Sequence, residues 1–421
     1  MKKSLQFVTK LFLIFLSTGV LFSYAMFQGG FVSWFLFFGA LPILIYMALL
    51  LIYPISRLKL ERRISQNIVE AGNSIKVEIR FKRDSFFPLY YCIIEDIMPD
   101  SMDWRDTKYS KYNFLSKPSM LKEKQGAKKV IFPWFKSTFS FEYRLKDIPR
   151  GEHLIQNIRV STGDFTGLIR KDYVFQVESK LFVYPAERKL TLRKNAESFE
   201  EGAASSFNRT LKNTTVVSGV REYAPGDRVS WIDWKASARK NTMMTKEFEQ
   251  EKSFDMLVLF DGTLHEKMNW LAFEGSVEVG LSLVKALRDD SARLIFSSLG
   301  AERRVFTLNQ DHLSKEKIRN HLTKITPLPS LPFSQMIKQE VGKLPQGFLF
   351  MVVTTSLSVD LYETLLQLRQ RSPRIVLFFV HAERAITSVE RDWFKLLKNN
   401  GIIVNQLTEE KLTKQSFEVN A

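Results

Sequence analysis

The stretch GVREYAPGDRVSWIDWKASARKNTMMTKEFEQE, residues 219–251, divides this chain into two kinds of sequence. Before it, short segments alternate between apolar and polar residues, which is typical of strands with one buried face. After it, the apolar run Met256–Phe260 ends at Asp261, as expected for a strand that is buried on both faces of a parallel sheet. Strand and helix patterns then alternate to the end of the chain. Residues 255–421 therefore predict a doubly wound α/β domain.

The dividing stretch itself combines turn signals, tryptophans and many charges. Pro225 and Gly226 fit the central positions of a type II turn, and Asp227 is suited to cap a helix over residues 228–239. The alternation over residues 243–248 predicts a strand. Asp227 and Asp233 lie among arginines, which lower carboxyl pKa values and make poor proton shuttles. We therefore interpret the stretch as an ion-paired interaction segment rather than a catalytic one.

Residues 64–190 predict a β-sandwich-like domain. Apolar and charged residues alternate strictly over residues 74–82, and other short strand patterns follow, separated by glycine-containing turns. Residues 191–254 then form a polar linker, placed over 193–215, and the dividing stretch. The overall prediction is a membrane-anchored α+β multidomain protein.

Residues 1–63 predict a transmembrane hairpin with basic flanks. Two uncharged apolar segments, 11–27 and 31–53, are long enough to cross a bilayer and are separated by three residues. Seven basic residues flank the hairpin and none lies in its turn, so the positive-inside rule predicts a multi-pass plasma-membrane protein with cytoplasmic termini. A cleaved signal peptide is the alternative.

Composition excludes several classes of protein. The 421 residues carry a formal charge of +16, but the basic residues form no clustered stripe, so we expect membrane lipids and not nucleic acid as the anionic partner. The single cysteine, Cys92, excludes an internal disulfide and a cysteine-based zinc site. Glycine-rich phosphate loops are absent. Carboxylates and histidines are present, but without the spacing of a catalytic constellation, so we expect no enzyme.

The dividing stretch resembles the signature of the DUF58 family. The matching residues are Arg221, Tyr223, Pro225, Gly226, Asp227, Ile232, Asp233, Trp234, Lys235, Ala236, Ser237, Ala238 and Arg239. The turns Arg150-Gly151 and Gly163–Leu168 are also similar to that family's pattern. The resemblance implies a von Willebrand factor A-like C-terminal domain, together with partners of the MoxR-type AAA+ ATPase and membrane transglutaminase-like classes.

Von Willebrand A domains bind a divalent metal through D-x-S-x-S, a threonine and a later aspartate. This chain offers Asp261, Thr263 and Thr354, with His265 where a serine is expected and no later aspartate. These residues make a degenerate Mg²⁺ site at best, so we predict no cofactor. The favoured function is a non-catalytic scaffold in cell-envelope assembly, and the alternative is a metal-dependent ligand-binding domain. A third hypothesis is an enzyme. It would be supported if Asp261, Thr354 and Asp233 lined one pocket in the structure.

Overall fold

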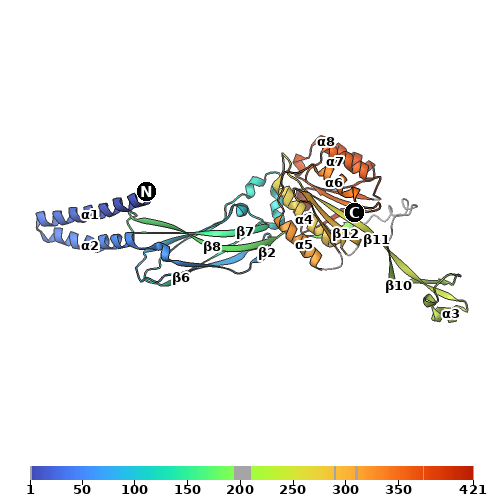
Figure 1. Ribbon diagram of the computed structural model, residues 1–421, viewed down its shortest axis with the longest axis horizontal. Coiled ribbons are helices and arrows are strands. Elements are labelled where there is room, and N and C mark those ends of the chain that lie inside the picture. Colours follow the sequence, from blue (N-terminus) through green and yellow to red (C-terminus); the bar gives the residue numbers. More distant parts are fainter. Residues whose placement is uncertain (1, 194–209, 289–290, 309–311, 373, 421) are drawn as a thin grey trace. The chain divides into compact units, whose positions relative to one another are not determined.

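The computed structural model describes residues 2–193, 210–288, 291–308, 312–372 and 374–420 (Figure 1). Two compact units divide the chain: Met1–Thr107 with Leu121–Tyr184, and Lys108–Met120 with Pro185–Ala421. The short segment Lys108–Met120 thus leaves the first unit and belongs to the second, which the sequence did not indicate.

The first unit begins with two apolar helices, α1 (Lys2–Gln28) and α2 (Phe31–Ile52). Both are long and apolar enough to cross a membrane, and they confirm the two predicted apolar segments. Gly29 supplies the positive φ of +59° that the tight turn between them requires. The helices contact each other through aromatic rings, such as Phe22 and Phe37 at 5.7 Å between centroids.

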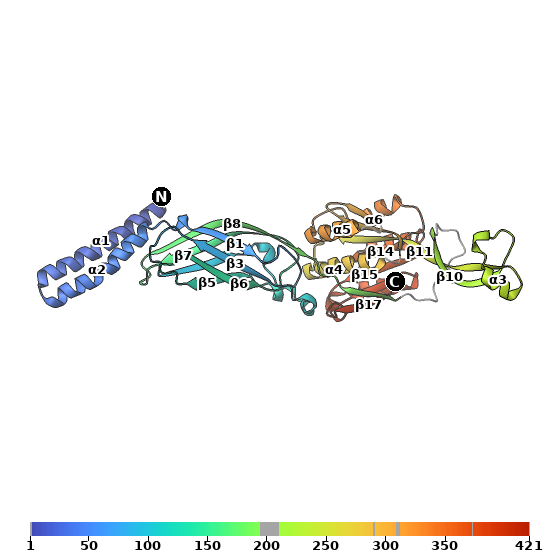
Figure 2. The same cartoon turned by 90° about the horizontal axis from the view of Figure 1, so that it is seen from below.

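Two sheets follow in the first unit (Figure 2). One is antiparallel, in the order β1 (Lys59–Ile64), β3 (Ile75–Lys82), β6 (Thr138–Leu145). The other has the order β2 (Ile68–Glu70), β8 (Arg170–Tyr184), β7 (Gly151–Gly163), β4 (Tyr91–Ile97), β5 (Gly126–Ile131). The alternation predicted over residues 74–82 is confirmed, because every second side chain of β3 is buried.

Buried side chains from both sheets share common clusters. Val77 of β3 packs in one cluster with Ile155 of β7, and Ile79 packs in another with Ile158. A fully buried ion pair also joins the sheets: Arg62 Nη2 lies 2.6 Å from Asp96 Oδ1. Arg62 donates in addition to the carbonyl of Ile155 at 2.8 Å, so the buried charge is satisfied on several sides.

The second unit is built on a seven-stranded mixed sheet. Its main order is β13 (Arg304–Leu308), β12 (Ser291–Gly300), β11 (Met244–Gly262), β14 (Leu349–Thr354), β15 (Ile375–Val380), β16 (Ile403–Leu407), and β10 (Thr210–Glu222) pairs with β11. β13 and β10 are antiparallel to their neighbours, and the other pairings are parallel. A separate pair joins β17 (Ser416–Asn420) to β9 (Lys189–Arg193).

Helices cover both faces of this sheet (Figures 1 and 2). Leu257 and Leu259 of β11 pack in a cluster with α6 (Phe333–Gly342), α7 (Val359–Leu368) and α8 (Ser388–Asn399). Phe260, on the opposite face of the strand, packs against Phe273 of α4 (Trp270–Leu287), with ring centroids 6.0 Å apart. The remaining helices are α5 (His312–Lys324) and α9 (Glu409–Leu412). The predicted alternation of strand and helix is confirmed.

The segment Lys108–Met120 packs against α4. Tyr112 is fully buried, and a Cβ built on Gly275 would come within 3.2 Å of its ring. The Lys111 ammonium lies 2.7 Å from the Glu278 carboxylate, with both side chains almost completely buried. Arg188 stacks over the rings of Tyr109, Tyr112 and Phe417.

Two local predictions around the dividing stretch are wrong. The helix predicted over residues 228–239 is instead a 3₁₀ turn at Val229–Trp231 followed by α3 (Trp234–Lys240), because Asp233 caps the helix and Asp227 is held elsewhere. The predicted linker over 193–215 ends earlier, since β10 begins at Thr210, and residues 194–209 lie outside the described part of the chain. The strand predicted at 243–248 belongs to β11, which continues without interruption to Gly262.

Candidate functional site

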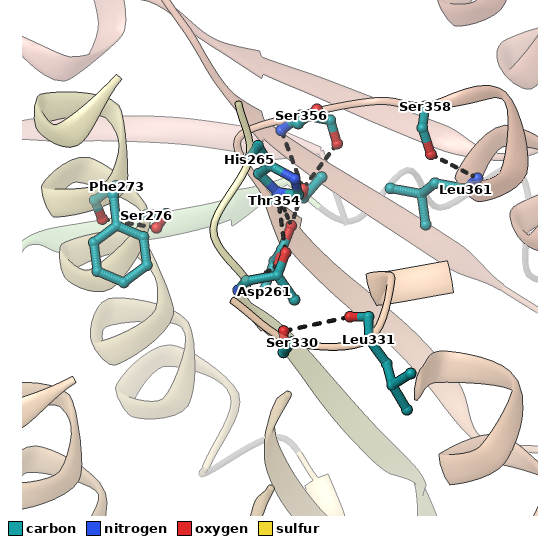
Figure 3. Close-up of polar contacts among 11 residues, drawn as sticks. Asp261, His265, Phe273, Ser276, Ser330, Leu331, Thr354, Ser356, Ser358 and Leu361 are labelled. Carbon is teal, nitrogen blue, oxygen red and sulfur yellow. Dashed lines mark hydrogen bonds and ion pairs between the residues drawn. The ribbon is translucent and has the colours of Figure 1, made fainter. Parts of the chain in front are cut away.

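A buried carboxylate at the carboxyl end of β11 collects hydrogen bonds from three side chains (Figure 3). Asp261 Oδ1 accepts from the Thr263 backbone N–H at 3.0 Å and from its hydroxyl at 2.6 Å. Asp261 Oδ2 accepts from the Thr354 hydroxyl at 2.7 Å, and Thr354 ends the neighbouring parallel strand β14. Adjacent parallel strands bring their carboxyl ends to one edge of a sheet, so the predicted meeting of Asp261 and Thr354 is found.

His265 closes this network. Its Nε2 lies 3.2 Å from Asp261 Oδ2 and 3.1 Å from the Thr263 hydroxyl. The hydrogen bond to Asp261 raises the pKa of the histidine above its ordinary value, and this effect outweighs the opposing effect of burial. The sequence predicts His265 to be a lone histidine without a matched partner, besides replacing a serine of the metal motif, and the Asp261 contact shows that this prediction is wrong. Its four-residue separation from a strand-ending aspartate was the signal that pointed to a partner.

The residues present do not fit a hard-cation site. Asp261 is the single carboxylate of this cluster, and the side chains bonded to it are two hydroxyls and an imidazole, whereas a hard cation takes six or more oxygen ligands. Among the described residues, no three His, Cys, Asp or Glu side chains gather in a way that would hold a metal. The imidazole stands where additional oxygen ligands would be needed. We read the cluster as a hydrogen-bonded lock between β11, β14 and the loop after β11.

The signature residues lie at the far end of the β10–β11 hairpin. Asp227 pairs with Arg221 at 2.6 Å and also accepts from the Ala224 backbone N–H at 2.9 Å, so both interactions lower the pKa of its carboxyl group. The predicted turn at Pro225-Gly226 is confirmed by a φ of +112° at Gly226 and by a hydrogen bond from Asp227 N to Ala224 O.

The remaining signature residues build a small helical cap on the hairpin. Asp233 Oδ1 accepts from Ala236 N at 3.0 Å, and the Ser237 hydroxyl accepts from Met244 N at 2.9 Å. Ile232 is buried and bridges to Thr245, and the Tyr223 backbone N–H donates to Met243 O. The exposed members of the cap include the signature residues Trp234, Lys235, Ala238 and Arg239 and the neighbouring Val229 and Met243.

The cap and the Asp261 network are separate sites. Ile232 contacts Thr245 near the start of β11, whereas Asp261 lies near its end. At roughly 3.3 Å per residue, the strand between them is on the order of 50 Å long. Asp233 therefore does not share a pocket with Asp261 and Thr354, and the arrangement gives no support to a catalytic centre assembled from the three.

Comparison with known proteins places this chain in a family. The family model described as "Protein of unknown function DUF58" matches residues 219–273, which include the cap and Asp261, Thr263 and His265 but not Thr354. "Uncharacterized protein YeaD" of Bacillus subtilis (strain 168) is 34% identical over 334 residues, covering 79% of this chain and 79% of the relative. The chain belongs to the DUF58 family.

Solved structures similar to this DUF58 protein match only weakly. The PilB minor pilin from Streptococcus sanguinis covers 79% of this chain and 87% of its own, with a TM-score of 0.27 and 7% identity. The bacterial hydrophobin BslA covers 31% of this chain and 98% of its own, with a TM-score of 0.19 and 9% identity. Scores this low carry no argument about fold or function.

The His265–Asp261 pair predicts a pH dependence of stability. A pKa raised in the folded state means that the pair stabilises fully below the unfolded pKa of about 6.5, and that this stabilisation is lost as pH rises through the folded pKa. Each pKa unit corresponds to about 1.4 kcal/mol. Thermal melts of the full chain in detergent should show wild type losing stability relative to His265→Asn as pH rises from 5.5 to 8.5. Parallel wild-type and His265→Asn profiles would contradict the prediction.

Proposed function

We propose that this DUF58 protein is a non-catalytic, membrane-anchored scaffold whose hairpin cap binds another protein. The proposal is supported by a difference between the polar groups of the cap, which bond to one another, and its apolar side chains, which are exposed. Its two aspartates and Ser237 are used to build it. Its large apolar side chains face solvent: Trp234 is 65% exposed, Val229 69% and Met243 52%. Exposed aromatic and aliphatic side chains held on an internally braced element are typical of interface anchors.

A catalytic role for the cap finds no support in its carboxylates. Arg221 holds the pKa of Asp227 below its ordinary value, and the Asp233 carboxylate is used as the N-cap of α3. A general base needs a pKa near the working pH and a free lone pair toward substrate. Both aspartates serve the shape of the cap instead.

The architecture proposed for this scaffold has three parts. α1 and α2 anchor it in the plasma membrane, and the proposal of cytoplasmic termini is supported by the basic flanks through the positive-inside rule. The two sheets of the first unit form a sandwich, supported by the clusters that they share. The second unit is a von Willebrand A-like domain in which the Asp261–His265 network replaces the metal, so no cofactor is required.

The partner that we propose is a MoxR-type AAA+ ATPase, acting with a membrane transglutaminase-like protein in cell-envelope assembly. Both follow from the family resemblance. A cytoplasmic ATPase would reach the cap if both termini are cytoplasmic, because the cap follows the hairpin anchor in the chain without another apolar span among the described helices.

Truncating the exposed apolar residues of the cap should abolish binding without unfolding the protein. We expect Trp234→Ala and Val229→Ala each to weaken co-purification of the full chain with the ATPase by about tenfold or more, as for interface anchors worth about 2 kcal/mol. Val359→Ala, at the start of α7, removes the same atoms from a side chain that is 54% exposed; it is the matched control and should change nothing. Undiminished co-purification with both cap variants would refute the proposal.

A further inference from the structure

One end of the first unit displays a group of exposed aromatic and apolar side chains, which we call the aromatic rim. Three loops carry it, at residues 83–90, 132–137 and 164–169. Its members are between 51% and 78% exposed: Phe86, Phe132, Trp134, Phe135, Phe165 and Leu168. Six such side chains at one end of a β unit form more apolar surface than scattered exposed residues explain.

The rim loops pack against the end of the apolar hairpin. The Phe87 ring stacks on Tyr46 and on Tyr53, with centroids 5.6 Å and 4.9 Å apart. Leu89 and Ile169, from two of the loops, are buried in one cluster with Leu50 and other residues of α2. The loops therefore adjoin the membrane-spanning candidate directly.

The position of Tyr46 gives the depth of the rim loops. Tyr46 precedes Ile52, the last residue of α2, by six positions, which correspond to about 9 Å along a helix. The 22 residues of α2 span about 33 Å, close to the thickness of a hydrocarbon core. A loop that reaches Tyr46 consequently overlaps the outer part of the bilayer.

The loops are held rigidly in this position. The buried Arg83 guanidinium donates to the carbonyls of Phe87 at 2.6 Å, Lys136 at 2.6 Å and Trp134 at 2.5 Å, which ties two rim loops together. The Lys171 ammonium donates to the carbonyls of Leu50, Leu51 and Tyr53, where α2 ends. The last carbonyl groups of a helix have no partner within the helix, and here a lysine of β8 donates hydrogen bonds to them. The end of α2 is therefore fixed to the β unit.

The charges around the rim match a lipid surface. Arg57 and Lys136 are exposed beside it, and the neighbouring carboxylates are engaged within the protein. Asp164 accepts from the backbone of Thr166 and Ile169, Asp84 pairs with Lys59, and Asp172 pairs with Arg170. Aromatic side chains edged with basic residues are typical of the interface between lipid tails and anionic headgroups.

From this geometry we infer that the aromatic rim inserts into the leaflet in which α2 ends, and seats this end of the β unit on an anionic bilayer surface. The inference rests on the proposed anchoring of α1 and α2. The partner is the bilayer itself, so the rim fixes the orientation of the β unit on the membrane in addition to tethering it.

Spin labels can measure this insertion in the full chain. The only cysteine, Cys92, is fully buried, and burial raises the pKa of its thiol to about 11, so an introduced cysteine is labelled selectively. The rim variants are Phe135→Cys and Leu168→Cys, in nanodiscs of phosphatidylcholine and phosphatidylglycerol. We compare their accessibility to oxygen, which concentrates in lipid, and to a water-soluble nickel complex.

Two further variants serve as references. Phe35→Cys labels the exposed surface of α2, and Ile68→Cys labels an equally apolar, 58% exposed residue of β2. Ile68 pairs with Phe182, at the end of β8 opposite to Arg170 and the rim. The oxygen-to-nickel accessibility ratio should be several-fold higher at the two rim positions than at Ile68.

The outcomes separate this inference from the proposed anchoring. If the rim labels have the same accessibility ratio as the Ile68 label while the Phe35 label lies in lipid, the proposed insertion of the rim is wrong. The proposed anchoring by α1 and α2 would still hold. Rim labels shielded from both reagents would indicate a second protein copy and would also overturn the insertion. A Phe35 label exposed to nickel would overturn both proposals.

Discussion

Replacing Glu278 with alanine is expected to lower the free energy of unfolding by about 3–5 kcal/mol, because it leaves buried positive charge without a counter-ion. The Glu278 side chain is 4% exposed, and its Oε1 accepts a hydrogen bond from Lys111 Nζ at 2.7 Å. The Arg188 guanidinium approaches its Oε2 at 4.0 Å. Alanine would leave two cations in the interior of the second unit without their carboxylate. The segment Lys108–Met120 should then detach from α4.

Urea unfolding of the full chain in detergent measures this loss. Asp392→Ala is the matched control, since its partner Lys395 lies on the surface and exposed pairs contribute about 1 kcal/mol or less. The double variant Lys111→Met/Glu278→Gln should recover part of the loss, because it removes one buried cation and keeps an acceptor facing Arg188. A destabilisation by Glu278→Ala no larger than that of Asp392→Ala would show that the buried pair does not hold the segment.

The elements that the sequence predicted are those with a local period. The alternation of β3 and the apolar run Met256–Phe260 are each complete within a few residues, and the structure contains both strands. The docking of Lys108–Met120 has no such local signal, because Lys111 and Glu278 are 167 positions apart. From the sequence alone, Lys111 is expected to be solvent-exposed, because lysines are almost never fully buried unless they are paired. Its distant partner, Glu278, is known only from the structure.

The candidate sites divide in the same way. The Pro225-Gly226 turn was predictable because glycine alone readily supplies the positive φ that a type II turn needs. The helix start was not, because Asp227 and Asp233 are both suitable caps, and the choice depends on Arg221 taking the Asp227 carboxylate. The aromatic rim has no local signal in the sequence, because its residues come from three loops that only the strand pairing of the folded β unit brings to one end.

Removing the carboxylate of Asp261 should destabilise the second unit by about 3–4 kcal/mol. Asp261→Ala deletes the acceptor of four hydrogen bonds and leaves buried donors on Thr263 and Thr354, each costing about 1–3 kcal/mol when unsatisfied. The Thr354 hydroxyl can then donate its single hydrogen to the Ser356 carbonyl, 2.9 Å away, which limits the loss. Asp261→Asn keeps one oxygen acceptor and should cost less, about 1–2 kcal/mol.

The same variants decide between a hydrogen-bonded lock and a metal site. A ligand that binds only the folded protein raises its stability with concentration. Melts of the full chain with millimolar Mg²⁺ or Mn²⁺ should therefore leave wild type unchanged, because His265, Thr263 and Thr354 already use the Asp261 oxygens. A metal-dependent rise in wild type that disappears in Asp261→Ala would instead support the von Willebrand A-type metal site. Thr364→Val, which removes a buried hydroxyl of α7 away from this network, is the control that shows the cost of losing one hydrogen bond alone.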